Sequence, residues 1–488
     1  MKLNALTGRI PGGVTILGDA EREILSLCSD SRHAEPGSLF FCIPGMHVDA
    51  HDLAPDAVRN GAVALVVERK LAVDRPQVLV GDVREALSYI AQDFYGNPAE
   101  GMKLVGITGT KGKTTSSFLV KSILEQAGHR TGLIGTVCSM VGEEVLPSRL
   151  TTPDPIEVQQ LLRRMADAGA EYVVMEVSAH ALAMHRLSGM RFAAAAFTNF
   201  SQDHLDYFGN MDNYFRAKMR LFEKDMCDEI VFNCDDERVA EGIERLGREA
   251  LRVGIRECSY VYANDIEVLE RGLNFLLTYH KRFRVSVGLK LSGIFNAYNA
   301  LLAAGVAIVL GVGPEAIKRG LEDVRAVPGR IELLETETPY RVILDYAHSP
   351  DSLENVLKAV RETTKGKLIA LFGCGGDRDH GKRPLMGEIA GELADLCILT
   401  SDNPRNEDPF AILNAIEEGI RHTGCEYTVI ENRREAIRRA LSIAEPGDVV
   451  VLAGKGHETY QEIRGVKHPF DEKIVVNELL REMRGNGK

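Results

Sequence analysis

The sequence has no excess of positive charge, because 58 lysines and arginines are outnumbered by 70 aspartates and glutamates, giving a net charge of −12. Proteins that bind nucleic acid or anionic membranes over a broad surface usually carry the opposite balance, so we expect neither partner. The nine cysteines include no C-x-x-C pair and no His/Cys cluster at zinc-finger spacing. This pattern predicts reduced thiols in a cytosolic protein.

Long apolar segments are also missing. The first residues, MKLNALTGRIPGG, contain no apolar core of the length that a signal peptide needs. The longest apolar run, 300–313, suits a buried helix better than a membrane span. We therefore expect a soluble, cytoplasmic protein. Its 488 residues exceed what one hydrophobic core usually organises, so several domains are expected.

Strand-like apolar runs alternate with amphipathic helical patterns along the chain, which is typical of α/β architecture. Examples are the runs 62–68, 103–109, 171–178, 229–233, 341–348, 367–373, 396–402 and 448–456. Glycine and proline gather at 95–102, and a Pro-Gly turn near 326–334 follows a long helical region. These two joints predict three domains, at 1–100, 101–331 and 332–488.

The stretch VGITGTKGKTTSS (105–117) resembles a phosphate-binding loop, but it departs from the G-x-x-x-x-G-K-[ST] pattern by one residue. Ile107 stands where that pattern has a glycine. The stretch nevertheless follows a predicted strand and precedes a helical pattern at 114–126, which is the context that such a loop requires. The alternative is a glycine-rich turn with a surface lysine.

The residue types in this loop suit a bound nucleotide. Gly109 and Gly112 allow the backbone to turn and to point N–H groups at phosphate oxygens. Lys113 would neutralise charge on the β- and γ-phosphates, and the helix N-terminus adds a partial positive charge. The Thr114 hydroxyl would ligate Mg²⁺, with Thr115 beside it.

Three further residues are candidates for metal chemistry. Glu176 ends the strand-like stretch 171–180, and a carboxylate at such a strand end commonly holds Mg²⁺, although a capping or salt-bridged glutamate is the alternative. His204 is equally compatible with a metal ligand and with the start of a helix. Lys218 lies on the apolar stripe of a predicted helix, four residues after Tyr214, so it must snorkel, pair or be modified.

Several segments together resemble the Mur ligases, the ATP-dependent enzymes that build the peptidoglycan stem peptide. The central ones are TGTKGKTT, MEVSAHAL, TNFSQDHLDYFG and AKMRLF, and the T-G-T-x-G-K-[ST] loop of that family accommodates Ile107. SDSRHAEPGSLFFCIPG (29–45) is similar to the UDP-binding domain of the enzymes that catalyse the third step. Five later segments resemble the C-terminal domain of those enzymes: VPGRIELL, DYAHSPDSLENVL, GCGGDRDHGKRPLM, TSDNPRNEDP and AGKGHETYQ.

The resemblance covers nearly the whole chain, and it implies a fold and a reaction. The fold is a central P-loop ATPase-type parallel sheet, a Rossmann-like C-terminal domain and a smaller N-terminal α/β domain that binds UDP-MurNAc. In the reaction, ATP phosphorylates a substrate carboxylate, and an amino group then displaces the phosphate. This chemistry requires cations and positioning rather than a protein nucleophile, and the sequence has no persuasive Ser/His/Asp or Cys/His set.

The resemblance also implies the catalytic residues Lys113, Glu176, His204 and Lys218. Thr114 and Glu176 would hold one Mg²⁺, and a second would lie near His204 and a carbamylated Lys218. A carbamate offers oxygen ligands to a divalent cation, whereas an ammonium group would repel it.

Three groups of substrate-binding residues follow from the same resemblance. The ATP group is Gly109, Thr110, Lys111, Gly112, Lys113, Thr114, Thr115, Asn296, Asn299, Arg330, Asp345 and His348. The UDP-MurNAc-dipeptide group is Ser29, Ser31, Met46, His47, Val48, Thr151, Thr152, Ser178 and Arg186. The acceptor group is Arg378, Asp402, Asn403, Pro404, Arg405, Gly454 and Glu458. Ordinary turns remain the alternative for Ser29 and Ser31, and local caps for Asn296 and Asn299.

The acceptor itself is indicated by the motif Asp402-Asn403-Pro404-Arg405. meso-Diaminopimelate carries a carboxylate that lysine lacks, and a planar guanidinium is suited to bind it. Arg405 therefore favours diaminopimelate, with Glu458 pairing with the distal ammonium. The alternatives are an Asn-Pro turn with a solvent-facing arginine, and the lysine-adding form of the same enzyme.

Two other classes of protein fit less well. A ligase like folylpolyglutamate synthetase lacks both the 29–45 segment and the Asp402–Arg405 motif. A GTPase-like switch is disfavoured because no N-K-x-D motif is present. We expect a monomer that acts on small-molecule substrates.

Overall fold

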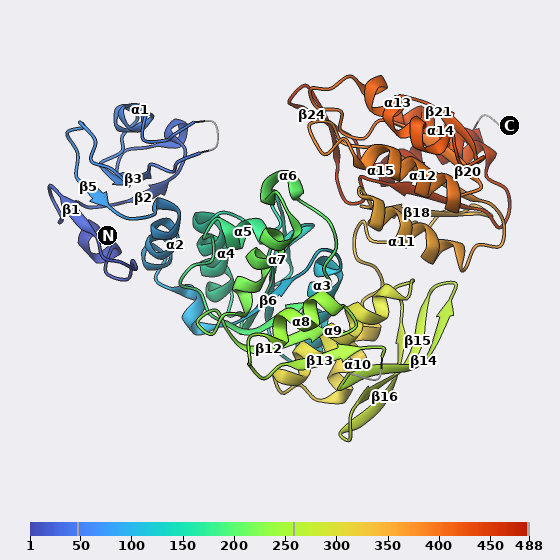
Figure 1. Ribbon diagram of the computed structural model, residues 1–488, viewed down its shortest axis with the longest axis horizontal. Helices are drawn as coiled ribbons and strands as arrows, with labels where there is room; N and C mark the ends of the chain where they lie inside the picture. Colours follow the sequence, from blue (N-terminus) through green and yellow to red (C-terminus); the bar gives the residue numbers. More distant parts are fainter. Residues whose placement is uncertain (46–47, 257–258, 486–488) are drawn as a thin grey trace.

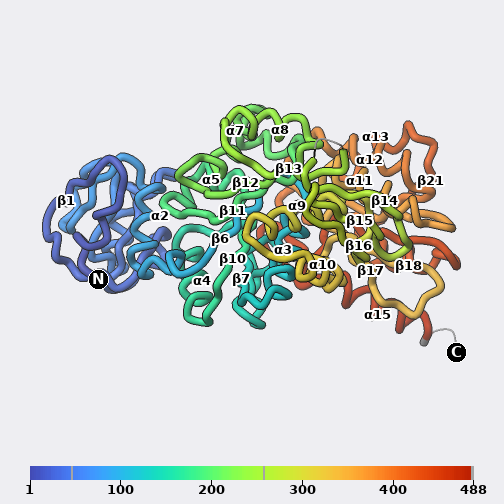
Figure 2. Tube along the Cα trace, turned by 90° about the horizontal axis from the view of Figure 1, so that it is seen from below, coloured from blue at the N-terminus to red at the C-terminus, as the bar shows by residue number. Residues whose placement is uncertain are grey.

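Three main sheets, each covered by helices, organise the computed structural model (Figure 1). The structure describes residues 1–45, 48–256 and 259–485. Figures 1 and 2 show three lobes in chain order, with the blue N-terminal lobe and the orange and red C-terminal lobe at opposite ends. The α/β class expected from the alternating patterns is confirmed.

The N-terminal sheet has the strand order β1-β5-β4-β3-β2. Its strands are β1 Thr15–Leu17, β2 Ser26–Cys28, β3 Ser38–Phe41, β4 Ala64–Val67 and β5 Gln77–Leu79, and its helices are α1 Ala54–Arg59 and α2 Val83–Phe94. Every residue of β3 and β4 is buried, because α2 packs on one face of the sheet and α1 on the other.

The central sheet has 11 strands in the order β16-β15-β14-β13-β12-β11-β6-β10-β7-β8-β9. The strands are β6 Lys103–Thr108, β7 Thr131–Ile134, β8 Cys138–Val141, β9 Glu144–Pro147, β10 Tyr172–Glu176, β11 Phe192–Phe197, β12 Cys227–Asn233, β13 Leu251–Gly254, β14 Val261–Leu269, β15 Gly272–Tyr279 and β16 Phe283–Leu289. Pairing is parallel from β7 to β14 and antiparallel at both edges of the sheet.

Helices cover both faces of this sheet. They are α3 Lys113–Gln126, α4 Pro155–Asp167, α5 Ala179–Ala183, α6 Leu205–Phe208, α7 Met211–Met219, α8 Glu237–Glu244, α9 Phe295–Val309 and α10 Pro314–Asp323. Alternate strand residues face opposite layers, so Ile107 packs with α3 and α9 whereas Met175 packs with α4. The apolar run 300–313 lies mostly in buried α9. Within the described ranges, no helix is both long and apolar enough to cross a membrane.

The C-terminal sheet has the order β17-β18-β22-β19-β20-β21, parallel except for β17. Its strands are β17 Glu332–Leu333, β18 Arg341–Asp345, β19 Leu368–Phe372, β20 Leu396–Leu399, β21 Glu426–Val429 and β22 Val449–Ala453, and a hairpin is formed by β23 Tyr460–Ile463 and β24 Val466–Pro469. Helices α11 Pro350–Arg361, α12 Lys382–Leu393 and α13 Pro409–Ile420 cover one face, and α14 Arg433–Ile443 and α15 Glu472–Gly485 cover the other.

Candidate active site

Glycines determine the conformation of the loop between β6 and α3, and two backbone carbonyl oxygens of this loop accept hydrogen bonds from Lys113. Gly109 (φ +142°) and Gly112 (φ +82°) adopt conformations that side chains disfavour. A Cβ on Gly112 would collide with the amide of Asn299, which comes from α9. The ammonium of Lys113 lies 2.9 Å from the carbonyl oxygen of Gly109 and 3.0 Å from that of Thr110. The strand, loop and helix expected from the sequence are all present.

Two lysines meet at one carbonyl oxygen of this loop. Lys218 of α7 donates to the Gly109 oxygen at 2.8 Å, and its ammonium lies 4.6 Å from the centre of the Tyr214 ring. The residue is 1% exposed, so the snorkelling interpretation is wrong. Burial lowers the pKa of Lys113 to about 8, and burial together with Lys113 lowers the pKa of Lys218 well below its ordinary range. Burial thus disfavours the charged form of both amines.

Glu176, at the end of β10, binds the first turn of α3. Its Oε2 accepts from the hydroxyls of Thr114 and Thr136, both at 2.9 Å, and its Oε1 accepts from the Thr136 N–H at 2.9 Å. Among the residues that the structure describes, no three His, Cys, Asp or Glu side chains are placed to hold a metal by themselves. Mg²⁺ keeps water and phosphate oxygens as ligands, so the carboxylate of Glu176 and the hydroxyl of Thr114 fit such an ion.

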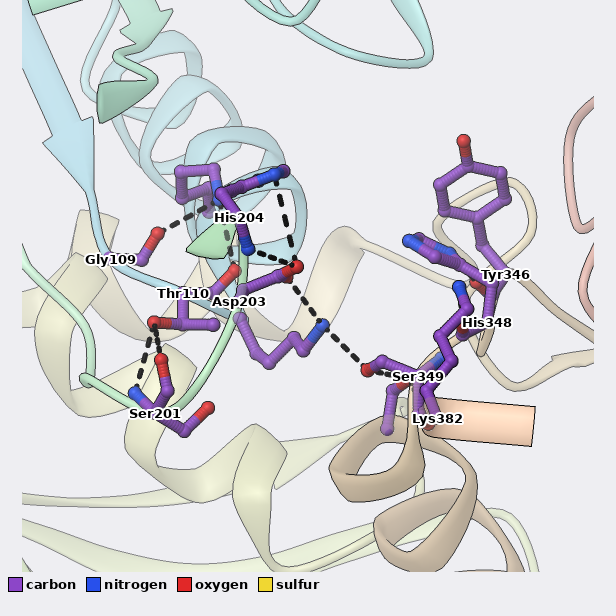
Figure 3. Close-up of polar contacts among 12 residues, drawn as sticks. Gly109, Thr110, Ser201, Asp203, His204, Tyr346, His348, Ser349 and Lys382 are labelled. Carbon is purple, nitrogen blue, oxygen red and sulfur yellow. Dashed lines mark hydrogen bonds and ion pairs between the residues drawn. The ribbon is translucent and has the colours of Figure 1, made fainter. Parts of the chain in front are cut away.

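The segment before α6 brings Asp203 and His204 towards the C-terminal lobe (Figure 3). Lys111 of the phosphate loop lies 3.3 Å from Asp203 Oδ2 and 3.0 Å from the hydroxyl of Ser349, so it connects the central and C-terminal lobes. His204 is the N-cap of α6, with φ +55°. Burial lowers the pKa of His204, although the negative charge of Asp203 acts to raise it. His204 is thus a helix-start residue that also lines a cavity.

Three further residues come from the joint between the two lobes and from the C-terminal lobe: Arg330 from the joint, and Asp345 and His348 from the C-terminal lobe. Arg330 Nη2 donates to Thr114 Oγ1 at 3.3 Å. The carboxylate of Asp345 accepts two backbone N–H groups at 2.7 Å, although burial raises its pKa. His348 Nδ1 lies 2.7 Å from the Tyr346 carbonyl oxygen. These bonds fix the side chains beside the phosphate loop.

The two asparagines near the start of α9 differ in their contacts. Asn296 Nδ2 donates to the Ser292 carbonyl oxygen at 2.7 Å, which is a local contact but not a cap, since the N-cap of α9 is Ile294. Asn299 Nδ2 donates to Asn296 Oδ1 at 2.8 Å, and its own Oδ1 lies 3.4 Å from the Ser116 hydroxyl. Asn299 therefore faces the phosphate loop, and Asn296 supports it from behind.

Most of the predicted ATP group lines one cavity of about 610 Å³. The lining members are Thr110, Lys111, Gly112, Lys113, Thr114, Thr115, Asn299, Arg330, Asp345 and His348, whereas Gly109 and Asn296 are not among the lining residues. A second cavity, of about 390 Å³, shares Asp203, His204, Tyr346 and His348 with the first. The two cavities therefore meet where the central and C-terminal lobes face each other (Figure 3).

The predicted acceptor group surrounds the second cavity. Arg378, Asp402, Asn403, Arg405, Gly454 and Glu458 line it, and Pro404 does not. Arg405 has φ +49°; its Nε lies 3.2 Å from Glu462 Oε2 and its Nη1 donates to the Gly376 carbonyl oxygen at 2.7 Å. The side chain of Arg405 is 22% exposed and lines the cavity. The structure therefore does not contain the alternative, an Asn-Pro turn whose arginine faces solvent.

Four residues predicted to bind the muramoyl-dipeptide gather at the carboxyl end of β10. Thr152 Oγ1 donates to the Glu176 carbonyl oxygen at 2.8 Å, and Arg186 Nη1 donates to the Thr152 carbonyl oxygen at 2.6 Å. Ser178 is the N-cap of α5, 3.3 Å from Thr152 Oγ1, and Thr151 lines the larger cavity. These residues are therefore neighbours of the phosphate loop.

The remaining members of that group belong to the N-terminal lobe. Ser29 is exposed, Ser31 begins a short 3-10 helix at Ser31–His33, and Val48 is 57% exposed. None of these three lines either of the two cavities. Met46 and His47 lie outside the described residues.

Residues without an assigned role also contribute to the site. Asp203 pairs with Lys111, Thr136 binds Glu176, and Lys382 donates to the His348 carbonyl oxygen at 2.7 Å. The carboxylate adjacent to His204 was a visible signal for Asp203. Thr136 carries no comparable signal, because its segment matches no motif.

His348 gives the site a testable pH dependence. Burial, with nearby Lys111 and Lys382, lowers the pKa of His348 to about 3. An unfolded histidine titrates near pH 6.5, so below that pH the unfolded chain binds more protons than the folded one. The free energy of unfolding therefore falls by about 1.4 kcal/mol per pH unit from this group. Urea unfolding at pH 7 and pH 5 should show a shallower fall for His348→Asn than for the wild type, whereas parallel curves would contradict the burial of a neutral imidazole.

Three family models match consecutive parts of the chain. They are "Mur ligase family, catalytic domain" over 23–95, "Mur ligase middle domain" over 107–307, and "Mur ligase, glutamate ligase domain" over 329–456. A UDP-N-acetylmuramoyl-L-alanyl-D-glutamate--2,6-diaminopimelate ligase of Caldanaerobacter subterraneus subsp. tengcongensis is 45% identical over 470 residues, which is 96% of this chain and 97% of the relative. The chain belongs to the Mur ligase family.

Other comparisons extend the match over nearly all of this Mur ligase. A relative of the same name from Geobacillus thermodenitrificans is 43% identical, covering 99% of this chain and 100% of its own. A solved structure of a UDP-N-acetylmuramoyl-L-alanyl-D-glutamate--2,6-diaminopimelate ligase has a TM-score of 0.71 and 32% identity, and covers 99% of each chain. The family resemblance and its three-domain architecture are thereby confirmed.

Proposed function

We propose that this Mur ligase joins meso-diaminopimelate to the D-glutamate carboxylate of UDP-N-acetylmuramoyl-L-alanyl-D-glutamate in peptidoglycan synthesis, converting ATP to ADP and phosphate. The observation that carries the proposal is the meeting of two cavities. The larger one contains the phosphate loop and the smaller one the Asp402–Arg405 motif, and they share residues such as His204 and His348. Relatives with this activity in their names match nearly the whole chain.

The chain's own groups suit phosphoryl transfer. Lys113, Arg330 and the N-terminus of α3 face the larger cavity and would neutralise phosphate charge. Mg²⁺ held by Glu176 and Thr114 would neutralise the β- and γ-phosphate oxygens further. Transfer of the γ-phosphoryl group to the substrate carboxylate gives an acyl phosphate, and attack by the acceptor's amino group releases phosphate and forms the amide.

The other substrate parts are assigned to the remaining groups. The cluster of Thr151, Thr152, Ser178 and Arg186 would bind the muramoyl-dipeptide, because a guanidinium pairs well with its carboxylates. The UDP part would contact the N-terminal lobe around Ser29 and Ser31. We assign these roles to domains at 1–100, 101–331 and 332–488 of a monomer.

Phosphate release by the purified protein tests the proposal. Release is expected only when ATP, Mg²⁺, the UDP-linked dipeptide and an acceptor are all present. meso-Diaminopimelate should exceed L-lysine and L-ornithine in kcat/KM by at least about tenfold, because a site built to pair with a carboxylate leaves its guanidinium unpaired with the other two. Equal use of L-lysine would favour the lysine-adding form, and ATP hydrolysis without any acceptor would contradict ligase activity.

A further inference from the structure

A buried lysine lies directly behind the acceptor cavity. Lys455 is 0% exposed and follows β22, between Gly454 (φ +114°) and Gly456 (φ +52°). Its neighbours Gly454 and Glu458 line the second cavity, whereas Lys455 does not. A charge with no access to solvent is stable only when other groups satisfy it. Within the described part of the chain, its hydrogen-bond acceptors all belong to the acceptor group.

The ammonium of Lys455 donates to three of these side chains. It lies 3.0 Å from Asn403 Oδ1, 3.1 Å from Glu458 Oε2 and 3.3 Å from Asp402 Oδ1. An ammonium has three N–H donors, so this arrangement uses all of them. Asn403 Nδ2 also donates to Glu458 Oε2 at 2.9 Å, which closes the cluster.

These bonds determine how Glu458 is presented to a ligand. Its Oε2 is occupied by Lys455 and Asn403, while Oε1, among the residues that the structure describes, has only a long contact of 3.5 Å with the Tyr346 hydroxyl. Lys455 supplies one positive charge to this cluster, whereas the carboxylates of Asp402 and Glu458 supply two negative charges. The cluster therefore keeps a negative charge that can pair with an ammonium group in the cavity.

A second buried cation next to the cluster has a carboxylate partner of its own. Arg433 of α14 is 2.8 Å from Glu472 Oε1, in an ion pair whose side chains are both 0% exposed. Arg433 also donates to the carbonyl oxygens of Ser401 and Ala453, which follow β20 and end β22. Its charge is thus balanced by Glu472, and its bonds hold the strand ends on which the cluster is built.

We infer that Lys455 is a positioning residue for the acceptor amino acid. It holds Glu458 and Asn403 in the orientation that binds the acceptor's ammonium end, and it acts through them without touching the substrate. This inference rests on the proposed function, because it concerns the residue that the ligase adds.

Lys455→Met tests the inference by removing the three donors while keeping most of the side chain's volume. The KM for meso-diaminopimelate is expected to rise about 30-fold, whereas the KM values for ATP and the UDP-linked dipeptide should change less than about twofold. The matched control is Lys467→Met. Lys467 contacts the same Tyr460 ring, at 4.0 Å against 5.8 Å for Lys455, but it lies on exposed β24 and should behave as the wild type.

A double-mutant cycle separates positioning from a purely structural role. If Lys455 acts through Glu458, adding Lys455→Met to Glu458→Gln should raise the KM for meso-diaminopimelate less than about threefold further. Fully multiplicative effects, or equal rises in the KM of all three substrates, would overturn the inference. Should the methionine variant not fold, Lys455→Gln replaces it, because the amide keeps two N–H donors without the charge.

The same cycle distinguishes failure of the inference from failure of the proposed function. If the wild-type protein uses a different amino acid, the proposed acceptor is wrong, and the cycle is then measured with the acceptor that the protein does use. If the wild type uses meso-diaminopimelate and Lys455→Met retains its KM, the inference alone is wrong.

Discussion

Lys218→Ala is expected to lower the rate of ligation by at least about 10³-fold while the protein stays folded. The Lys218 amine is only 2.8 Å from the carbonyl oxygen of Gly109, inside the loop that would bind the phosphates. As a carbamate it would give oxygen ligands to a cation near His204, which the methyl group of alanine cannot replace. Stability should change little, because the Gly109 carbonyl oxygen keeps its hydrogen bond from Lys113 when Lys218 is removed. Phosphate release at saturating substrates measures the loss.

One variant separates a carbamate from an ammonium, and a second serves as its control. Lys218→Arg keeps a cation that cannot be carbamylated, so it should be as inactive as Lys218→Ala. Lys224→Ala removes a lysine that is exposed a few residues later and should leave the rate unchanged. Wild-type protein depleted of CO₂ should lose activity and regain part of it with excess bicarbonate. Full activity of Lys218→Ala would contradict a catalytic role for Lys218. Activity of Lys218→Arg would show that the reaction needs a cation at this position and not a carbamate.

The sequence was most informative about buried parallel strands. Each apolar run identified in the sequence overlaps a strand, as in β10, where all residues from Tyr172 to Glu176 are buried. Strands covered on both faces need uninterrupted apolar residues, which makes them conspicuous. The antiparallel strands β14, β15 and β16 were not anticipated. Buried and exposed residues are mixed along β14 and β16, so their sequences contain no continuous apolar run.

The candidate site was predictable to the extent that it is local. Gly112 and Lys113 stand within one strand–loop–helix unit, whose geometry follows from short-range rules. Contacts between distant residues were not predictable in this way. Lys111 meets Ser349, 238 positions away, because the two lobes pack together, and Lys218 reaches Gly109 across 109 positions. A single sequence places a residue at the end of an element, but the packing of domains decides which side chains meet there.

Arg405→Ala is expected to raise the KM for meso-diaminopimelate by about 100-fold, because a guanidinium–carboxylate pair contributes about 3 kcal/mol when it is partly buried. Arg405 is already oriented by the carboxylate of Glu462 and the carbonyl of Gly376, so little conformational entropy is lost when it binds a ligand. The KM for ATP should stay the same, since Arg405 lines the smaller cavity and not the larger one. Initial rates with each substrate varied in turn measure both constants.

The neighbouring hairpin offers a matched control for this substitution. Arg464 also has φ +49°, and its N–H donates to the Arg405 carbonyl oxygen at 2.8 Å, so Arg464→Ala imposes the same side-chain loss at the same φ. Its KM values should equal those of the wild type. L-Lysine provides a second comparison: it lacks the distal carboxylate, so Arg405→Ala should leave its kcat/KM nearly unchanged and reduce the preference for diaminopimelate. An unchanged KM for diaminopimelate, or an equal loss with both amino acids, would mean that Arg405 maintains the shape of the loop and does not bind the distal carboxylate.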